Sequence, residues 1–169
     1  MFMKTLSMIA ISVFAVVAAA SQSAPTQQLT PIYAMLDALT VKKDMKGLTK
    51  MLTSITTKDC VFITAQGKKQ TVSDVTGSMT MQMGMIDKVV KSTSHIDKIA
   101  NSGNSVVATV TSAYELLTKA GGDGKTHKIE GTSKSDDTWI KVGASWRLKS
   151  SKTLKEATTM DGKPVSGMG

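Results

Sequence analysis

The chain has 169 residues, of which 41% are hydrophobic and 4% aromatic, and a formal net charge of +8. This length is sufficient for one domain with a hydrophobic core. The positive charge suggests an anionic partner, but Arg147 is the single arginine of the sequence and the other basic residues are scattered lysines. Because nucleic-acid recognition relies on arginine and on stacked aromatic side chains, we expect no nucleic-acid binding.

Residues 1–20 predict a signal peptide for export. Lys4 supplies a positive start, Leu6–Val17 an apolar segment, and Ala18–Ala20 the small residues of a cleavage site. The apolar segment is short for a membrane span and has no basic flank, so we expect no stable membrane anchor after cleavage. The mature protein is therefore expected in the periplasm or outside the cell, beginning with a polar linker over residues 21–28.

Cys60 is the sole cysteine of this exported chain, so it can form no intramolecular disulfide. It lies within the apolar strand pattern Asp59–Ile63, where a free thiol usually packs as a small hydrophobic group. We expect Cys60 to be a core residue.

The first half of the chain predicts three helices and one strand. Each helix follows a residue that can cap its first turn: Thr30 before Pro31, Asp44, and Thr71 with Asp74 three residues on. Apolar residues then recur at helical spacing, namely Ile32, Met35, Leu36 and Leu39; Leu48, Met51, Leu52 and Ile55; and Val72, Val75, Met79 and Met83. A strand is expected over residues 57–65, between the second and third helices.

The second half of the chain predicts β-structure. Strands are expected over residues 89–99, 106–116, 129–142 and 146–154, separated by turns rich in Gly, Asn and Asp. The order α-α-β-α-β-β-β-β indicates an α+β fold with three helices packed on one face of an antiparallel sheet. Residues 29–160 are expected to form this single domain, and residues 161–169 a loose tail.

This order of elements, and the closing pattern Asp137-x-Trp139-x-Lys141-x-Gly143-x-x-Trp146-Arg147-Leu148, resemble the nuclear-transport-factor-two-like superfamily. More narrowly, the chain is similar to its exported SnoaL-like branch of domains of unknown function. The resemblance covers about residues 28–165 and also rests on Asp44–Leu48 and Asp59–Phe62. It implies a cystatin-like cone, in which helices curl over a strongly curved sheet and enclose an apolar pocket. The superfamily includes isomerases, dehydratases, epoxide hydrolases and non-catalytic binding or dimerising domains, so the fold does not decide the function.

The ketosteroid isomerases of this superfamily allow one comparison of chemistry. Their general base lies five residues after the acidic residue that enters the first strand, and Thr64 occupies that position here. A threonine hydroxyl cannot act as a base near neutral pH. Their oxyanion-donating tyrosine lies on the first helix, where Tyr33 falls one turn early and Leu36 fits the alignment better. These two departures argue against ketosteroid-isomerase chemistry, while an acid–base enzyme of isomerase, dehydratase or hydrolase type that uses the cone pocket remains an alternative.

Non-catalytic binding of a small apolar molecule in the cone is the leading hypothesis, with no cofactor. The residues expected to line the pocket come from the helix stripes and the inward strand faces: Tyr33, Leu36, Phe62, Met79, Met83, Tyr114, Trp139 and Trp146. A homodimeric interaction module, associating through the outer face of the sheet, is another hypothesis.

Acid–base catalysis is the remaining enzymatic hypothesis, and His95 and Asp97 are its candidates. They stand two residues apart on one predicted strand, so their side chains share a face, where the carboxylate could orient the imidazole. Lys91 and Thr93 lie on the same side, however, which favours a solvated strand face.

The run Met79-Thr80-Met81-Gln82-Met83-Gly84-Met85 raises the alternative of copper binding, because thioethers are soft ligands that suit Cu(I). In an extended segment the methionines would share one face and could converge on a metal. In a helix they split into Met79 with Met83 and Met81 with Met85, on nearly opposite sides. The cap at Thr71 favours the helix, with methionines as adaptable packing or pocket residues.

Overall fold

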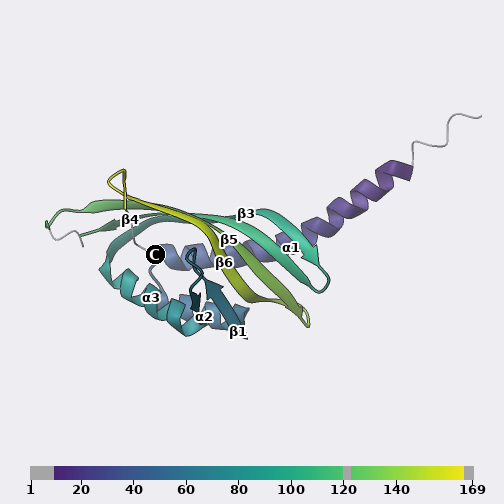
Figure 1. Cartoon of the computed structure of the whole chain (residues 1–169), viewed down its shortest axis with the longest axis horizontal. Helices are drawn as coiled ribbons and strands as arrows, with labels where there is room; N and C mark the ends of the chain where they lie inside the picture. The colour runs from purple at the N-terminus through teal and green to yellow at the C-terminus, as the bar shows by residue number, and fades with distance from the viewer. Residues whose placement is uncertain (1–9, 120–122, 166–169) are drawn as a thin grey trace, which may run out of the picture.

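The computed structural model describes residues 10–119 and 123–165, with side chains from Ala24 onward. These ranges contain the following elements: α1 (Ala10–Val41), α2 (Met45–Ile55), β1 (Thr56–Ile63), β2 (Lys69–Gln70), α3 (Val72–Met85), β3 (Ile86–Ser102), β4 (Ser105–Thr118), β5 (His127–Val142), β6 (Ser145–Met160) and β7 (Lys163–Pro164). Figure 1 shows the helices on one side of long, curved strands, which confirms the predicted α+β fold. The beginning of the predicted signal peptide and part of the predicted 120–124 turn lie outside the described residues.

The strands form one mixed sheet in the order β2-β1-β6-β5-β4-β3, with β7 paired to β6. Strands β3 to β6 are antiparallel neighbours, as predicted. The expectation of a wholly antiparallel sheet is wrong at one place, because β1 runs parallel to β6. Strand β1 connects to β3 through β2 and α3 rather than by a tight hairpin to β6, so no turn ties its direction to that of β6.

The predicted starts of the second and third helices are confirmed. Asp44 Oδ1 accepts the Gly47 N–H at 2.8 Å at the start of α2. At the start of α3, Thr71 and Asp74 form a reciprocal capping box, in which each side chain accepts the backbone N–H of the other.

Helix α1 differs from the prediction at its start. The polar linker expected over residues 21–28 is helical, and the helix runs through Pro25 and Pro31 instead of beginning at Thr30. A proline inside a helix removes one backbone hydrogen bond. Here the Thr30 hydroxyl donates to the Thr26 carbonyl at 2.8 Å, and Leu29 is fully buried in the core. Tertiary packing therefore keeps this turn helical.

The buried face of α1 is also rotated from the predicted stripe. Leu29 and Tyr33 are buried, whereas Met35 is 58% exposed. On the following turn Asp37 faces β3, where its carboxylate accepts the Ser92 hydroxyl at 2.8 Å and the Ser94 N–H at 2.7 Å. Because β3 is the last strand of the sheet, α1 covers an edge that would otherwise expose backbone groups.

The core lies between α1, β1 and strands β4 to β6. Its buried members are Leu29, Tyr33, Cys60, Val106, Ala108, Val110, Trp139 and Leu148. Burial raises the pKa of the Cys60 thiol to about 11, so the prediction of a packed, unreactive cysteine is confirmed. Among the described residues, no helix combines the length and apolarity needed to cross a membrane.

The predicted loose tail is ordered as far as it is described. Strand β7 pairs with the end of β6, and the Val165 N–H donates to the Thr158 carbonyl at 3.0 Å. His127, the first residue of β5, holds the turn between β6 and β7. Its Nδ1 lies 2.7 Å from Asp161 Oδ2, and its Nε2 lies 2.9 Å from Asp123 Oδ1.

These contacts predict a pH-dependent contribution to stability. The hydrogen bonds to Asp161 and then to Asp123 raise the pKa of His127 above 6.5. The stabilisation of the folded state by His127 is therefore complete below pH 6.5 and is lost as the pH rises through the raised pKa. The pKa values of both aspartates are lowered from 3.8, so their contribution is lost only in more acidic solution. We expect His127→Gln to lower the Tm most near pH 5 and progressively less toward pH 9, as measured by circular dichroism. A His95→Gln control on the exposed part of β3 should change the Tm little at either pH.

Candidate functional site

A buried hydrogen-bond network joins α1 to β5 and β6. The Tyr33 hydroxyl donates to Asp137 Oδ2 at 2.7 Å, and Trp139 Nε1 donates to the Tyr33 oxygen at 3.0 Å. The Ser151 hydroxyl donates to the other Asp137 oxygen at 2.6 Å. The Tyr33 and Trp139 rings also meet edge to face, with centroids 6.0 Å apart. The network fixes the position of α1 over the face of the sheet that we call the inner face.

Burial controls the protonation of this network. Asp137 is 5% exposed, and burial raises its pKa although the hydrogen bonds from Ser151 and Tyr33 act to lower it. Burial, and after it the neighbouring Asp137 carboxylate, raise the pKa of Tyr33. Tyr33 therefore remains a hydrogen-bond donor, and Asp137 can hold a proton at a higher pH than an exposed aspartate can.

A band of hydroxyl groups crosses the inner face beside this network. Strand pairing places Ser94 beside Ser112, Ser112 beside Ser133, and Ser135 beside Thr153. We call these residues the hydroxyl band: Ser94, Ser112, Ser133, Ser135 and Thr153. All of them are half-buried.

Two members of the hydroxyl band have free hydrogen-bonding capacity. Within the described residues Ser133 and Thr153 make no side-chain hydrogen bond, and neither hydroxyl is sealed from solvent. Helix α1 packs mainly along β3, and α3 lies against β1 and α2. The helices therefore leave the inner face of β5 and β6 accessible around these two residues.

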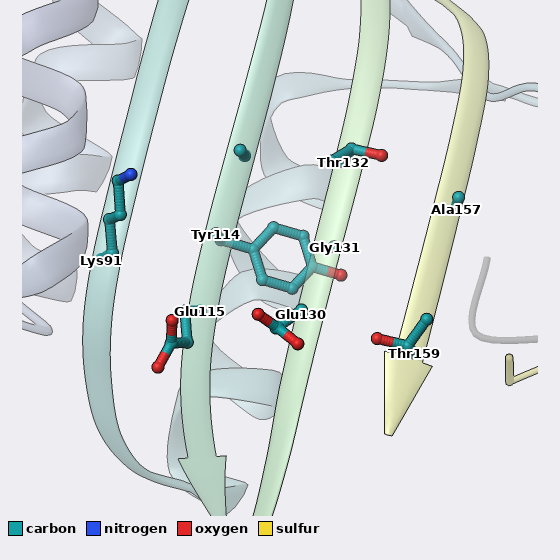
Figure 2. A pocket seen from close by; sticks show the side chains of 9 residues that line it. Lys91, Tyr114, Glu115, Glu130, Gly131, Thr132, Ala157 and Thr159 are labelled. Atoms are coloured by element: carbon teal, nitrogen blue, oxygen red, sulfur yellow. The ribbon is translucent and has the colours of Figure 1, made fainter. Parts of the chain in front are cut away.

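Tyr114 closes the far end of the hydroxyl band. Its ring lies across Gly131 on the neighbouring strand, and its hydroxyl is 3.2 Å from Thr158 Oγ1 on β6. Figure 2 shows this region from the opposite, outer face, where an open depression of about 280 Å³ is rimmed by charged side chains. Its lining residues are Lys91, Ala113, Tyr114, Glu115, Glu130, Gly131, Thr132, Ala157 and Thr159.

A second depression, of about 500 Å³, lies where α1, the end of α2 and the β5–β6 hairpin meet. We call it the hairpin cleft. Its lining residues are Gln28 and Ile32 from α1, Ser54 and Ile55 from α2, and Ala144–Arg147 from the hairpin and β6.

The residues predicted to line one apolar pocket occupy several places. Tyr33 and Trp139 belong to the buried network, Tyr114 borders the outer depression, and Trp146 lines the hairpin cleft. The remaining predicted residues, Leu36, Phe62, Met79 and Met83, are half-buried. A shared pocket formed by these four residues stays a prediction.

The structure does not support the hypothesis of a catalytic pair at His95 and Asp97. Both residues are exposed on the outer face of β3, and neither lines a depression described above. Asp97 instead accepts the Thr111 hydroxyl at 2.7 Å and pairs with Lys134 at 3.2 Å. The equivalent of the isomerase base, Thr64, serves the turn after β1 by accepting the Lys68 N–H.

The structure also speaks against the copper alternative. Because α3 is helical through Met85, the four methionines divide: Met79 and Met83 are half-buried, while Met81 and Met85 are 72% and 55% exposed. In the described ranges, no group of three or more His, Cys, Asp or Glu side chains is arranged to hold a metal ion.

Asp137 is a residue of this site that the sequence analysis names only within the closing pattern and not as a candidate site residue. A usable signal was present, since Asp137 lies two residues before the buried Trp139 on the same strand and so shares its face. An aspartate on a core face requires hydrogen-bond donors, and Tyr33 is a core-facing donor on α1. Its partner Ser151 had no comparable signal, because the β-bulge in β6 shifts the pairing with β5.

Comparisons with known proteins agree with this architecture. No protein-family model and no curated protein matches the chain. Solved structures do match, among them structures of nuclear-transport-factor-two-like proteins, so the chain has the nuclear-transport-factor-two-like cone fold.

Three of these structures illustrate the likeness. A conserved protein from Planctomyces limnophilus has a TM-score of 0.61 and 14% identity, with 85% of this chain and 100% of that chain covered. A nuclear-transport-factor-two-like protein from Salmonella enterica has a TM-score of 0.53 and 19% identity, with coverages of 85% and 94%. A scytalone dehydratase-like protein from Novosphingobium aromaticivorans has a TM-score of 0.52 and 15% identity, with coverages of 86% and 95%. At these identities the likeness concerns the fold alone.

Proposed function

We propose that this protein binds a small molecule on the inner face of its sheet without converting it. The hydroxyl band carries the proposal, because Ser133 and Thr153 lie on the helix side of the sheet, lack partners within the described residues and still reach solvent. A polar group in such a position is available to a ligand at little desolvation cost.

The chemistry of this face also suggests what the ligand contains. Hydroxyl groups both donate and accept hydrogen bonds and carry no charge, so they suit uncharged polar groups such as hydroxyls and carbonyls. Val110 and Leu116, on the same face of β4, are buried on either side of Ser112, so apolar side chains surround the hydroxyl band. We therefore infer a ligand that combines an apolar body with a few hydrogen-bonding groups, rather than a purely apolar one.

Helix α3 is the element best suited to adapt to such a ligand. It has no fully buried residue, and its half-buried methionines, Met79 and Met83, have flexible, polarisable side chains. Small movements of α3 would change the access to the inner face while leaving α1 fixed by the Tyr33–Asp137 network.

Acid–base catalysis on the same face is the second candidate function, and Asp137 favours it. Its raised pKa allows it to hold a proton, and Tyr33 is a neutral donor beside it. Asp137 is nearly inaccessible, however, and both of its carboxylate oxygens already accept hydrogen bonds. These observations support binding over catalysis.

Native mass spectrometry of the protein purified from its own cells tests the proposal. We expect an adduct of small-molecule mass that is retained by the wild type and lost from the double variant Ser133→Ala, Thr153→Val. The matched control is Thr111→Val, Thr132→Val on the outer face, which should retain the adduct. Equal retention by both double variants would contradict inner-face binding, and a wild-type spectrum with bare protein alone would do the same.

The same spectra distinguish the alternatives. In a binding protein, wild type and Asp137→Asn retain a molecule of one mass, whereas an enzyme blocked at Asp137 would retain its substrate in place of its product. A dimer mass would support the homodimer hypothesis. We also propose export, which predicts a chain that begins after Ala20; Leu29 and Tyr33, the buried residues of α1, follow this point and remain in the mature protein.

A further inference from the structure

The inner face carries a carboxylate beside the hydroxyl band, that of Glu156 on β6. Glu156 is directly opposite Ser133 in the β5–β6 pairing, and Ser133 is directly opposite Ser112 in the β4–β5 pairing. Residues directly opposite each other in an antiparallel sheet point to the same side, with Cβ atoms roughly 4.5–5.5 Å apart. Glu156 therefore shares the inner face with the hydroxyl band and is a direct neighbour of Ser133.

The Glu156 carboxylate has an oxygen available for a ligand. Its Oε1 accepts Gln66 Nε2 at 3.3 Å, from the turn between β1 and β2. Within the described residues Glu156 makes no other hydrogen bond and no ion pair, and its side chain is exposed. An ionised carboxylate only accepts hydrogen bonds, so its free oxygen suits a donor, above all a charged one.

The Tyr114 ring lies beside this carboxylate. Its hydroxyl is 3.2 Å from Thr158 Oγ1, and Thr158 is two residues from Glu156 on β6. On β5, Gly131 beneath the ring is likewise two residues from Ser133. Two residues along a strand span about 7 Å, so the ring is the next group along the inner face after the Glu156–Ser133 pair.

One face of the Tyr114 ring is directed away from the sheet. A Cβ atom at Gly131 would lie 2.1 Å from Cζ, 2.3 Å from the hydroxyl oxygen and 2.4 Å from Cε1 of Tyr114, so Gly131 meets the face of the ring (Figure 2). Tyr114 is half-buried, and no lysine or arginine of the described residues lies over its ring. The face of an aromatic ring attracts cations.

The lysines around these groups lie on the other side of the sheet. Lys134 and Lys155 are next to Ser133 and Glu156 in the chain, so they point to the outer face. Lys91 lines the outer depression. The net charge of +8 opposes the binding of cations in general, so selective binding of one requires local groups such as these.

We propose that the ligand of the inner face carries a protonated amine, which binds between the Glu156 carboxylate and the Tyr114 ring. Ser133 is placed to accept a further hydrogen bond from the same ammonium group, which has donors only. This inference rests on the proposed function and names the chemical class of its ligand. The apolar body of the ligand then extends along the hydroxyl band.

Titration with phenethylamine, and with 2-phenylethanol as its uncharged counterpart, tests the proposal. The two molecules share one carbon skeleton, and at pH 7 the amine is protonated. Calorimetry measures both affinities. We expect the amine to bind about tenfold more tightly than the alcohol, because only the amine gains the ion pair and the cation–π contact.

Variants of Glu156 identify the charge responsible. Glu156→Gln keeps the shape of the side chain and should weaken binding of the amine about fivefold, while the affinity for the alcohol changes less than about twofold. The matched control is Glu130→Gln, which removes an exposed carboxylate from the outer face and should change neither affinity by more than about twofold.

Variants of Tyr114 identify the role of the ring. Tyr114→Phe keeps the ring and should bind the amine within about twofold of the wild type, whereas Tyr114→Leu should weaken it about threefold or more. Circular dichroism confirms that each variant is folded, and Glu156→Gln tests the proposal even if Tyr114→Leu does not fold.

Three results would overturn the proposal: equal affinity for amine and alcohol, equal effects of Glu156→Gln and Glu130→Gln, or no saturable binding of millimolar amine. The double variant Ser133→Ala, Thr153→Val separates this inference from the proposed function. If only the cation assignment is wrong, the double variant weakens both probes and Glu156→Gln weakens neither. If inner-face binding is itself wrong, the double variant changes the affinity of neither probe.

Discussion

Replacing Asp137 with alanine is expected to lower the free energy of unfolding by about 3–5 kcal/mol. The change leaves the Tyr33 and Ser151 hydroxyls without their acceptor inside the core, and it creates a cavity between α1 and the sheet. Urea denaturation followed by circular dichroism measures the effect. A loss below about 1 kcal/mol would show that the network does not hold α1 in place.

Asp136 provides the matched control, because it is the same residue type at the next position of β5. It is half-buried on the outer side and accepts one hydrogen bond, from Thr109 at 2.7 Å. Asp136→Ala should therefore cost about 1 kcal/mol or less. Comparable losses for the two alanine variants would contradict a special role for the buried carboxyl.

The pH dependence of Asp137 follows from its raised pKa. Below pH 3.8, the ordinary pKa of an aspartate, Asp137 is protonated in both the folded and the unfolded chain. Between pH 3.8 and the raised pKa of the folded state, Asp137 loses its proton in the unfolded chain but keeps it in the folded chain. Wild-type stability should therefore fall over this interval relative to Asp137→Asn. The difference between the two unfolding free energies isolates this group from the other carboxylates.

Gly131→Ala is expected to destabilise the protein by about 2–3 kcal/mol. A Cβ atom at this position would lie 2.1 Å from Cζ of Tyr114, so the ring would have to leave its place over Gly131. That movement breaks the contact between the Tyr114 hydroxyl and Thr158. Thermal and urea denaturation measure the loss.

Gly77 on α3 is the control for this substitution. A Cβ atom there meets nothing within 4 Å, so Gly77→Ala should stabilise α3 by about 0.5–1 kcal/mol through its higher helix propensity. A double-mutant cycle locates the cause at the Tyr114 ring. In a Tyr114→Ala background Gly131→Ala should cost much less, and an unchanged cost would rule out this clash as the mechanism.

Local features of the sequence predicted many elements of the fold. The caps at Asp44 and Thr71, the alternation of β4 and the Gly143 turn depend on residues only a few positions apart, so the chain encodes them directly. The helical state of the methionine run was predictable in the same way. The candidate site was harder to predict from the sequence, because each of its contacts joins residues that are far apart in the chain.

The predicted buried stripe of α1 is wrong for one physical reason. It follows apolar periodicity and passes through Met35, whereas the buried side carries Tyr33 and, on the next turn, Asp37. The inner face offers Asp137 to Tyr33, and Ser92 with Ser94 to Asp37, so polar side chains pack there with their hydrogen bonds satisfied. Apolar periodicity cannot find a helix face whose partners are polar.

Local patterns are sufficient to predict the α+β order, the packing of Cys60 and the helical state of the methionine run, because these features depend on local propensity and burial. Tertiary contacts settle which groups meet: Tyr33 with Asp137, Tyr114 over Gly131, and Trp146 with Gln28, while His95 is left exposed on β3. Strand register, a bulge and the rotation of one helix decide these contacts. Each depends on long-range packing, which no local pattern encodes.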